Sequence, residues 1–164
     1  MRIVIATTGA LSADPVAKFA ERLTGPDGVV YVTTVIEVPR SFLDEIRSEE
    51  WMPEPDGNAP WATQEDAVIA RYVEERGARL TDPLVAALRE RGVDAKVMFL
   101  EGEDPTATIL EAVEEIGADL IVMGATRALF DESQWESISA RVAREARCPV
   151  LVIPAGPVEG DGES

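Results

Sequence analysis

Five short apolar segments alternate with longer segments of helical periodicity, and this alternation constrains the fold more than any other feature. The apolar segments are rich in β-branched residues and too short for typical helices, so they are predicted to be buried strands. They cover residues 2–7, 29–38, 94–100, 120–123 and 150–153. Strands that alternate with helices form βαβ units. We therefore predict a three-layer α/β fold, in which a doubly wound, five-stranded and mainly parallel sheet is covered by helices on both faces.

Capping residues mark two of the predicted helix starts. Asp14 precedes Pro15 and Asp104 precedes Pro105, and an N-cap Asp followed by Pro in the first turn is typical of a helix start. Gly117 is predicted to end the second of these helices. The first should bury one stripe of apolar side chains, namely Val16, Phe19, Ala20 and Leu23.

Two further helices are predicted, over residues 61–91 and 134–146. Pro83 lies inside the first of them. Proline removes a backbone hydrogen bond and clashes with the preceding turn, so we expect a kink or a break near Thr81.

Length and composition limit the class of protein. The 164 residues are 46% hydrophobic and 28% charged, which is typical of one globular domain. The net charge of -16 repels nucleic acids and anionic membranes. No apolar run approaches the roughly 20 residues that span a bilayer. The start reads as a strand rather than a signal peptide, so we expect a cytoplasmic protein.

Metal and redox chemistry have few candidate residues. The chain contains no histidine and a single cysteine, Cys148, so a zinc site and a histidine-based triad are excluded. We interpret Cys148 as a buried structural thiol rather than a reactive one.

Two segments differ in composition from the rest of the predicted domain, which covers residues 1–154. The acidic insert at 40–60 is rich in Pro and Gly and is bracketed by Trp51 and Trp61. The tryptophans either pin this loop to the body or bind a protein partner. The acidic tail at 155–164 is predicted to be disordered. A weak cation site in the insert is less favoured than a solvated acidic loop.

The candidate site lies at one edge of the predicted sheet. In open parallel sheets, ligands bind beyond the carboxyl ends of the strands, where the strand order reverses. The loops that matter are then residues 7–10 and 124–127.

Three sequence segments resemble the universal stress protein family over nearly the whole chain. They are RIVIATTG, EGEDPTATILEAVEEIGADLIVMGA and SISARVAREARCPVLVIP. The resemblance implies strand order 3-2-1-4-5, as in adenine nucleotide alpha hydrolase-like folds. It also implies a homodimer through the edge strand, here Val150 to Ile153. An apolar edge strand of this kind is an aggregation hazard if left bare.

The family's ATP-binding loop is altered in this chain. Family members that bind ATP carry Gly, two residues, Gly, about nine residues, Gly, then Ser or Thr. Here Gly124 and Ser137 match, but Arg127 and Glu136 replace the second and third glycines. Thr8 replaces the aspartate expected after the first strand. A carboxylate about 4 Å from a phosphate costs on the order of 1 to 4 kcal/mol, although Arg127 could itself contact a phosphate.

Two functions remain open. The first is a non-enzymatic, stress-protein-like dimer that has no cofactor, has lost tight ATP binding, and acts in the stress response through protein contacts. The alternative is a regulatory switch that binds ATP, AMP or a nucleoside in a modified cleft. That cleft would be lined by Thr7, Thr8, Val35, Met123, Gly124, Thr126, Arg127 and Ser137. A core position is the favoured interpretation of Val35 and Met123, and a helix cap is the favoured interpretation of Ser137.

An enzyme is disfavoured. The sequence shows no nucleophile elbow, no Walker loop and no metal-ligand spacing.

Overall fold

The computed structural model describes residues 1–38, 41, 44, 61–125 and 137–154, with side-chain surroundings from Asp66 onward in the helix that begins at Trp61. In chain order the elements are β1 (Arg2–Ala6), α1 (Ala13–Thr24), β2 (Val29–Ile36), α3 (Trp61–Glu90), β3 (Asp94–Glu101), α4 (Pro105–Ile116), β4 (Leu120–Gly124), α5 (Ile138–Glu145) and β5 (Val150–Ile153). The five strands agree with the predicted strands to within two residues. Most of the predicted insert, with Trp51, and the predicted tail lie outside the described residues.

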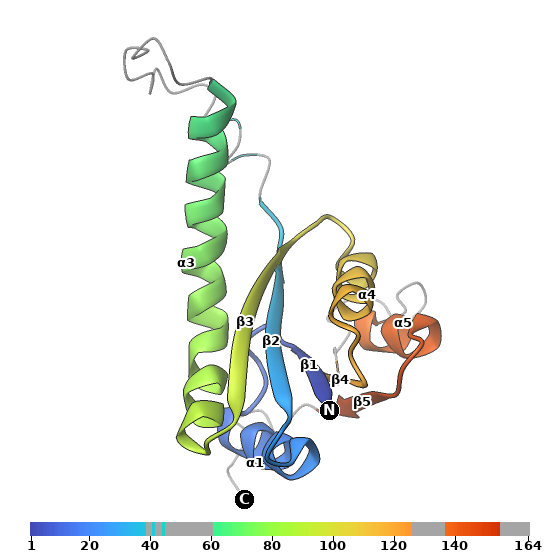
Figure 1. The fold of residues 1–164 in the computed structure, drawn as a ribbon. Coiled ribbons are helices and arrows are strands. Elements are labelled where there is room, and N and C mark those ends of the chain that lie inside the picture. The colour runs from blue at the N-terminus through green and yellow to red at the C-terminus, as the bar shows by residue number, and fades with distance from the viewer. Residues whose placement is uncertain (39–40, 42–43, 45–60, 126–136, 155–164) are drawn as a thin grey trace, which may run out of the picture.

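The strands form one parallel sheet in the order β3-β2-β1-β4-β5, which confirms the predicted fold. Helices α1 and α3 cover one face, and α4 and α5 cover the other (Figure 1). The N-terminal half of α3 extends beyond the carboxyl edge of the sheet (Figure 1).

The central strand β1 distributes its side chains between two cores. Ile3 and Ile5 pack with residues of α1 and α3, whereas Val4 and Ala6 pack with residues of α4 and α5. This alternation follows from the two-residue period of a strand. Because both faces are buried, the strand is apolar from Ile3 to Ala6, as the sequence predicted.

Helix α3 continues across Pro83, so of the kink or break predicted near Thr81 the break is wrong. An internal proline costs roughly 3 kcal/mol, but the helix is held on both sides of it. Val73 precedes Pro83, Leu84 and Leu88 follow it, and all three are buried. The Thr81 hydroxyl donates a hydrogen bond of 2.9 Å to the carbonyl oxygen of Gly77. Tertiary packing therefore outweighs the local cost.

Helix α1 differs from its prediction in its cap and in one core residue. It begins at Ala13 with Ser12 at the N-cap position, and Asp14 lies inside the first turn. Phe19 is 42% exposed, whereas Ala17 is fully buried. The small Ala17 lets the helix approach the sheet closely. With Ala17 facing the sheet, Phe19 lies at the side of the helix and not in the core.

Helix α4 has the predicted cap. The Asp104 side chain accepts hydrogen bonds from the backbone N–H groups of Thr106, at 3.1 Å, and Ala107, at 3.3 Å. Gly117 ends the helix in the left-handed conformation, at φ 67°, where glycine is favoured.

Candidate functional site

A cleft of about 350 Å³ opens at the carboxyl edge of the sheet. It lies where β1 pairs with β2 on one side and with β4 on the other, which is the switch point of a doubly wound fold. The described residues that line it are Ala6, Thr7, Thr8, Ala10, Leu11, Ser12, Pro15, Val16, Thr34, Val35, Pro105, Ile109, Met123, Gly124, Ala125, Ile138, Ile153 and Pro154.

The loop after β1 is fixed by a short hydrogen-bonded turn. The Thr7 N–H donates to the carbonyl oxygen of Thr33 at 2.9 Å, and the Thr7 hydroxyl accepts from the Gly9 N–H at 2.9 Å. Gly9 has φ 88°, and a Cβ added there would lie 3.0 Å from a Leu80 methyl carbon of α3. The loop therefore needs glycine both for its backbone conformation and for its contact with α3.

The end of β4 forms the facing side of the cleft. The Ala125 N–H donates to the carbonyl oxygen of Ile153 at 2.7 Å and so continues the ladder between β4 and β5. A Cβ added at Gly124 would lie 3.1 Å from a methyl carbon of Leu11. A close approach to the cleft wall thus explains this glycine without any ligand.

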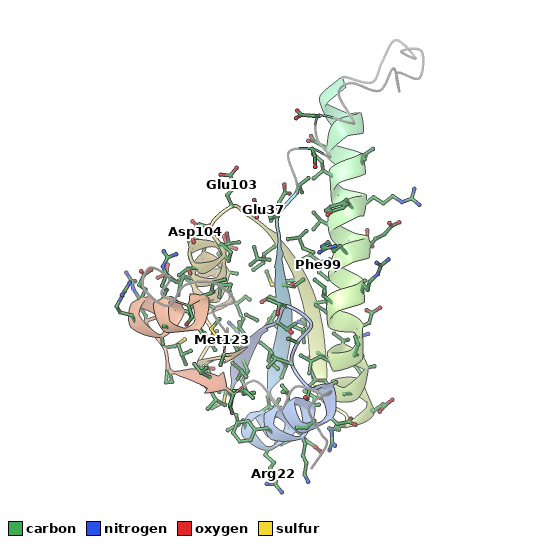
Figure 2. The ribbon with its side chains drawn as sticks, turned by 180° about the vertical axis from the view of Figure 1, so that it is seen from behind. Arg22, Glu37, Phe99, Glu103, Asp104 and Met123 are labelled. Carbon is green, nitrogen blue, oxygen red and sulfur yellow. The ribbon has the colours of Figure 1, made fainter. Side chains whose placement is uncertain are left out.

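Five of the predicted site residues line the cleft: Thr7, Thr8, Val35, Met123 and Gly124. They come from the ends of β1, β2 and β4, and Figure 2 shows Met123 among them. Val35 and Met123 also pack with the core below α4 and α5, so both interpretations of these two residues remain compatible with their positions.

Ser137 is not among the described residues that line the cleft. It is the N-cap of α5, and its hydroxyl accepts from the Ala140 N–H at 3.2 Å and lies 3.1 Å from the Ser139 hydroxyl. This geometry is that of a helix cap. The predicted site residues Thr126 and Arg127, and Glu136 with them, lie outside the described residues.

The described lining of the cleft is uncharged. Its polar side chains are the hydroxyl groups of Ser12, Thr7, Thr8 and Thr34, and the remaining side chains are apolar. Such a surface suits a flat or apolar ligand that also makes a few hydrogen bonds.

A second hollow of about 370 Å³ adjoins the cleft. Thr8, Thr34 and Val35 line both hollows, and the second also contains Ile36, Glu37, Arg76 and Leu80. We call this second hollow the α3 groove. Figure 2 shows Glu37 just beyond the end of β2.

Sequence reasoning missed the two charged residues of the α3 groove. Arg76 lies on a helix rich in exposed charges, where nothing in the sequence distinguishes it from Arg71 or Arg79. The available signal was Glu37, which follows β2 at the carboxyl edge of the sheet.

Cys148 lies away from the cleft. It is half-buried and packs against the core below α4 and α5. Burial, which disfavours the thiolate, raises the pKa of the thiol, with a smaller contribution from the charge of Asp119. A backbone hydrogen bond opposes the shift.

Neither a metal-binding cluster nor a membrane-spanning helix occurs among the described residues. No group of three or more Cys, Asp or Glu side chains there could hold a metal ion. No helix in the same part of the chain has the length and apolar character needed to cross a membrane.

The sheet order and the cleft together define a doubly wound α/β domain with a cleft at its switch point. The model of the Universal stress protein family matches residues 1–154, and the chain belongs to this family.

Known relatives extend this match. The universal stress protein Sll1654 of Synechocystis is 38% identical over 81 residues, which are 49% of this chain and 51% of that protein. The chain thus aligns with about half the length of that relative. The universal stress protein MJ0531 of Methanocaldococcus jannaschii is 29% identical over 154 residues, covering 93% of this chain and 81% of that protein.

Solved structures share the fold. A universal stress protein family member from Burkholderia pseudomallei has a TM-score of 0.58 at 27% identity, over 94% of this chain and 96% of that chain. A universal stress protein in complex with cAMP has a TM-score of 0.59 at 17% identity, over 95% and 98%. A family member from Arabidopsis thaliana with AMP bound has a TM-score of 0.57 at 17% identity, over 99% and 97%.

Proposed function

We propose that the chain is a non-enzymatic regulatory domain whose cleft binds a nucleoside or a nucleoside monophosphate, and binds ATP only weakly. The observation that carries the proposal is the uncharged lining of the cleft among the described residues. Apolar walls accommodate the uncharged part of such a ligand, and the threonine and serine hydroxyls supply the hydrogen bonds that orient it.

Charge argues against a triphosphate. The chain has a net charge of -16, and Glu136 replaces a glycine of the family's phosphate loop. Each like-charge contact at about 4 Å costs on the order of 1 to 4 kcal/mol, which corresponds to roughly one to three decades of affinity. Nucleosides avoid this cost, and monophosphates reduce it. The structurally similar proteins solved with AMP and with cAMP support a ligand with few charges.

The test is isothermal titration calorimetry of the purified chain with guanosine, adenosine, AMP and ATP. We expect micromolar binding of at least one nucleoside or monophosphate, and ATP binding at least about tenfold weaker. Micromolar ATP binding, or the failure of all four ligands to bind, refutes the proposal.

A matched pair of variants locates the binding. Ala10 is exposed and lines the cleft, so Ala10→Trp should block the ligand with little effect on the fold. Ala86 is another exposed alanine, on α3, and it lines neither hollow. Ala86→Trp should bind as the unmodified chain does. If Ala10→Trp also binds normally, the ligand lies elsewhere.

We further propose that the chain acts as a homodimer through β5. This strand pairs with β4 on one side and is the last strand of the sheet, and Val152 on it is 39% exposed. Pairing with a second β5 would cover an apolar edge. The protein contact through the insert bracketed by Trp51 and Trp61 stays a prediction.

A further inference from the structure

The α3 groove contains one positive and one negative side chain from different elements. Arg76 comes from α3 and Glu37 from the end of β2. Neither forms an ion pair within 4.0 Å with any residue that the structure describes. The guanidinium and the carboxylate are therefore both available to a ligand.

The position of Arg76 is fixed by the residues next to it on α3. Gly77 is buried against the ring of Phe99 on β3, so close that an added Cβ would overlap the ring. One turn later, Leu80 meets Gly9 in the loop after β1. These two contacts hold this turn of α3 against the sheet, so the backbone that carries Arg76 has little freedom.

Thr34 connects the α3 groove to the cleft. Its side chain lines both hollows and the residue is only 2% exposed. Its hydroxyl makes no hydrogen bond with any residue of the described part of the chain. A ligand that reaches from one hollow into the other would pass this hydroxyl, which can donate or accept a hydrogen bond.

The charges of the α3 groove match one kind of base. Guanine presents two acceptors, O6 and N7, which an Arg guanidinium binds with two hydrogen bonds. On its other edge it presents the donors N1–H and N2–H, which suit a carboxylate. Adenine presents an amino donor in place of O6 and is best matched by Asn or Gln. The apolar side chains of Ile36 and Leu80 supply walls for a flat ring.

We propose that the α3 groove selects guanine, with Arg76 on the O6 and N7 edge and Glu37 on the N1 and N2 edge, and that the ribose extends past Thr34 into the cleft. This inference rests on the proposed function. Glu37 also disfavours a phosphate in the α3 groove, since its carboxylate repels an anion.

The test compares guanosine, adenosine, inosine and 7-deazaguanosine by isothermal titration calorimetry. Guanosine should bind about tenfold or more tightly than adenosine. Inosine lacks the 2-amino group and 7-deazaguanosine lacks the N7 acceptor, so each should bind several-fold more weakly than guanosine. Titration with GMP shows whether the physiological ligand is a free nucleoside or carries a phosphate.

Variants assign each edge of the base. Arg76→Gln should remove the difference between guanosine and 7-deazaguanosine, and Glu37→Gln the difference between guanosine and inosine. The matched controls are Arg79→Gln and Glu103→Gln, which change exposed side chains of the same charge that line neither hollow. Both controls should keep the full preference for guanosine. Thermal melts of all four variants check that the fold is intact.

The outcomes separate the two proposals. If adenosine binds as tightly as guanosine, or if the Arg76 and Glu37 variants keep the preference, the inference about guanine is wrong while the proposed function stands. If no nucleoside or monophosphate binds, both are wrong.

Discussion

Substitution of Gly77 by alanine tests the contact that seats α3 on the sheet. In an unobstructed helix, alanine is more stable than glycine by about 1 kcal/mol. At position 77, however, the added Cβ would lie 2.3 Å from Phe99 Cδ1 and 2.7 Å from Cε1 and Cγ. Figure 2 shows Phe99 between β3 and α3. Forcing such an overlap typically costs about 1–3 kcal/mol, so Gly77→Ala should destabilise the protein by about 1 kcal/mol once the helix gain is subtracted.

The sign of the effect should reverse when the ring is removed. In a Phe99→Ala background, Gly77→Ala should stabilise the protein by about 1 kcal/mol, since only the helix preference remains. Urea unfolding followed by circular dichroism measures both, at a fixed protein concentration. Ala86→Gly at an exposed position of α3 calibrates the intrinsic preference. The reasoning is refuted if Gly77→Ala stabilises the unmodified protein as much as Ala86→Gly destabilises it.

Three further predictions concern the cap, the thiol and the dimer. Asp104→Ala should lower the free energy of unfolding by about 1 kcal/mol because two backbone N–H groups lose their acceptor, whereas Glu103→Ala should change it by less than about 0.5 kcal/mol; a melt in which the two variants are equal contradicts the cap. Because burial raises the pKa of Cys148, iodoacetamide should alkylate this thiol more slowly at pH 8 than it alkylates a small free thiol. The free energy of unfolding should also fall as the pH rises from the pKa of the thiol in the unfolded chain towards its pKa in the folded chain. Alkylation as fast as that of the free thiol contradicts the burial. Val152→Lys should convert the proposed dimer to a monomer in light scattering coupled to size-exclusion chromatography, and an unchanged mass argues against assembly through β5.

The centre of the sheet could be predicted from the sequence because β1 and β4 are largely apolar on both faces. Strand β1 shows this most clearly, since Val4 and Ile5 point to opposite faces of the sheet and both are fully buried. The Asp104 cap was equally predictable because its determinants are adjacent in the chain. Local signals failed where distant residues decide the outcome. The continuity of α3 depends on the burial of Leu84 and Leu88 against strands far away in the sequence, which a proline rule does not include.

The candidate site was predictable only in its position. The end of each strand identifies the edge at which ligands bind, and this placed Thr8 and Gly124 correctly at the cleft. The α3 groove was not predictable, because Glu37 and Arg76 line one hollow only after α3 packs beside β2. Charge on a helix surface carries no information about which of its residues face a groove.

The order of the strands has a consequence for synthesis of the chain on the ribosome. Strand β1 pairs with β2 from residue 29 onward, but its other neighbour, β4, begins only at Leu120. A nascent chain that has released β3 can therefore assemble β1, β2 and β3 while one side of β1 still has unpaired N–H and carbonyl groups. We expect stalled chains that end after residue 101 to bind chaperones. Longer chains, from which β4 and β5 have also left the ribosome, should lose this binding. Equal chaperone binding by both lengths contradicts this order of assembly.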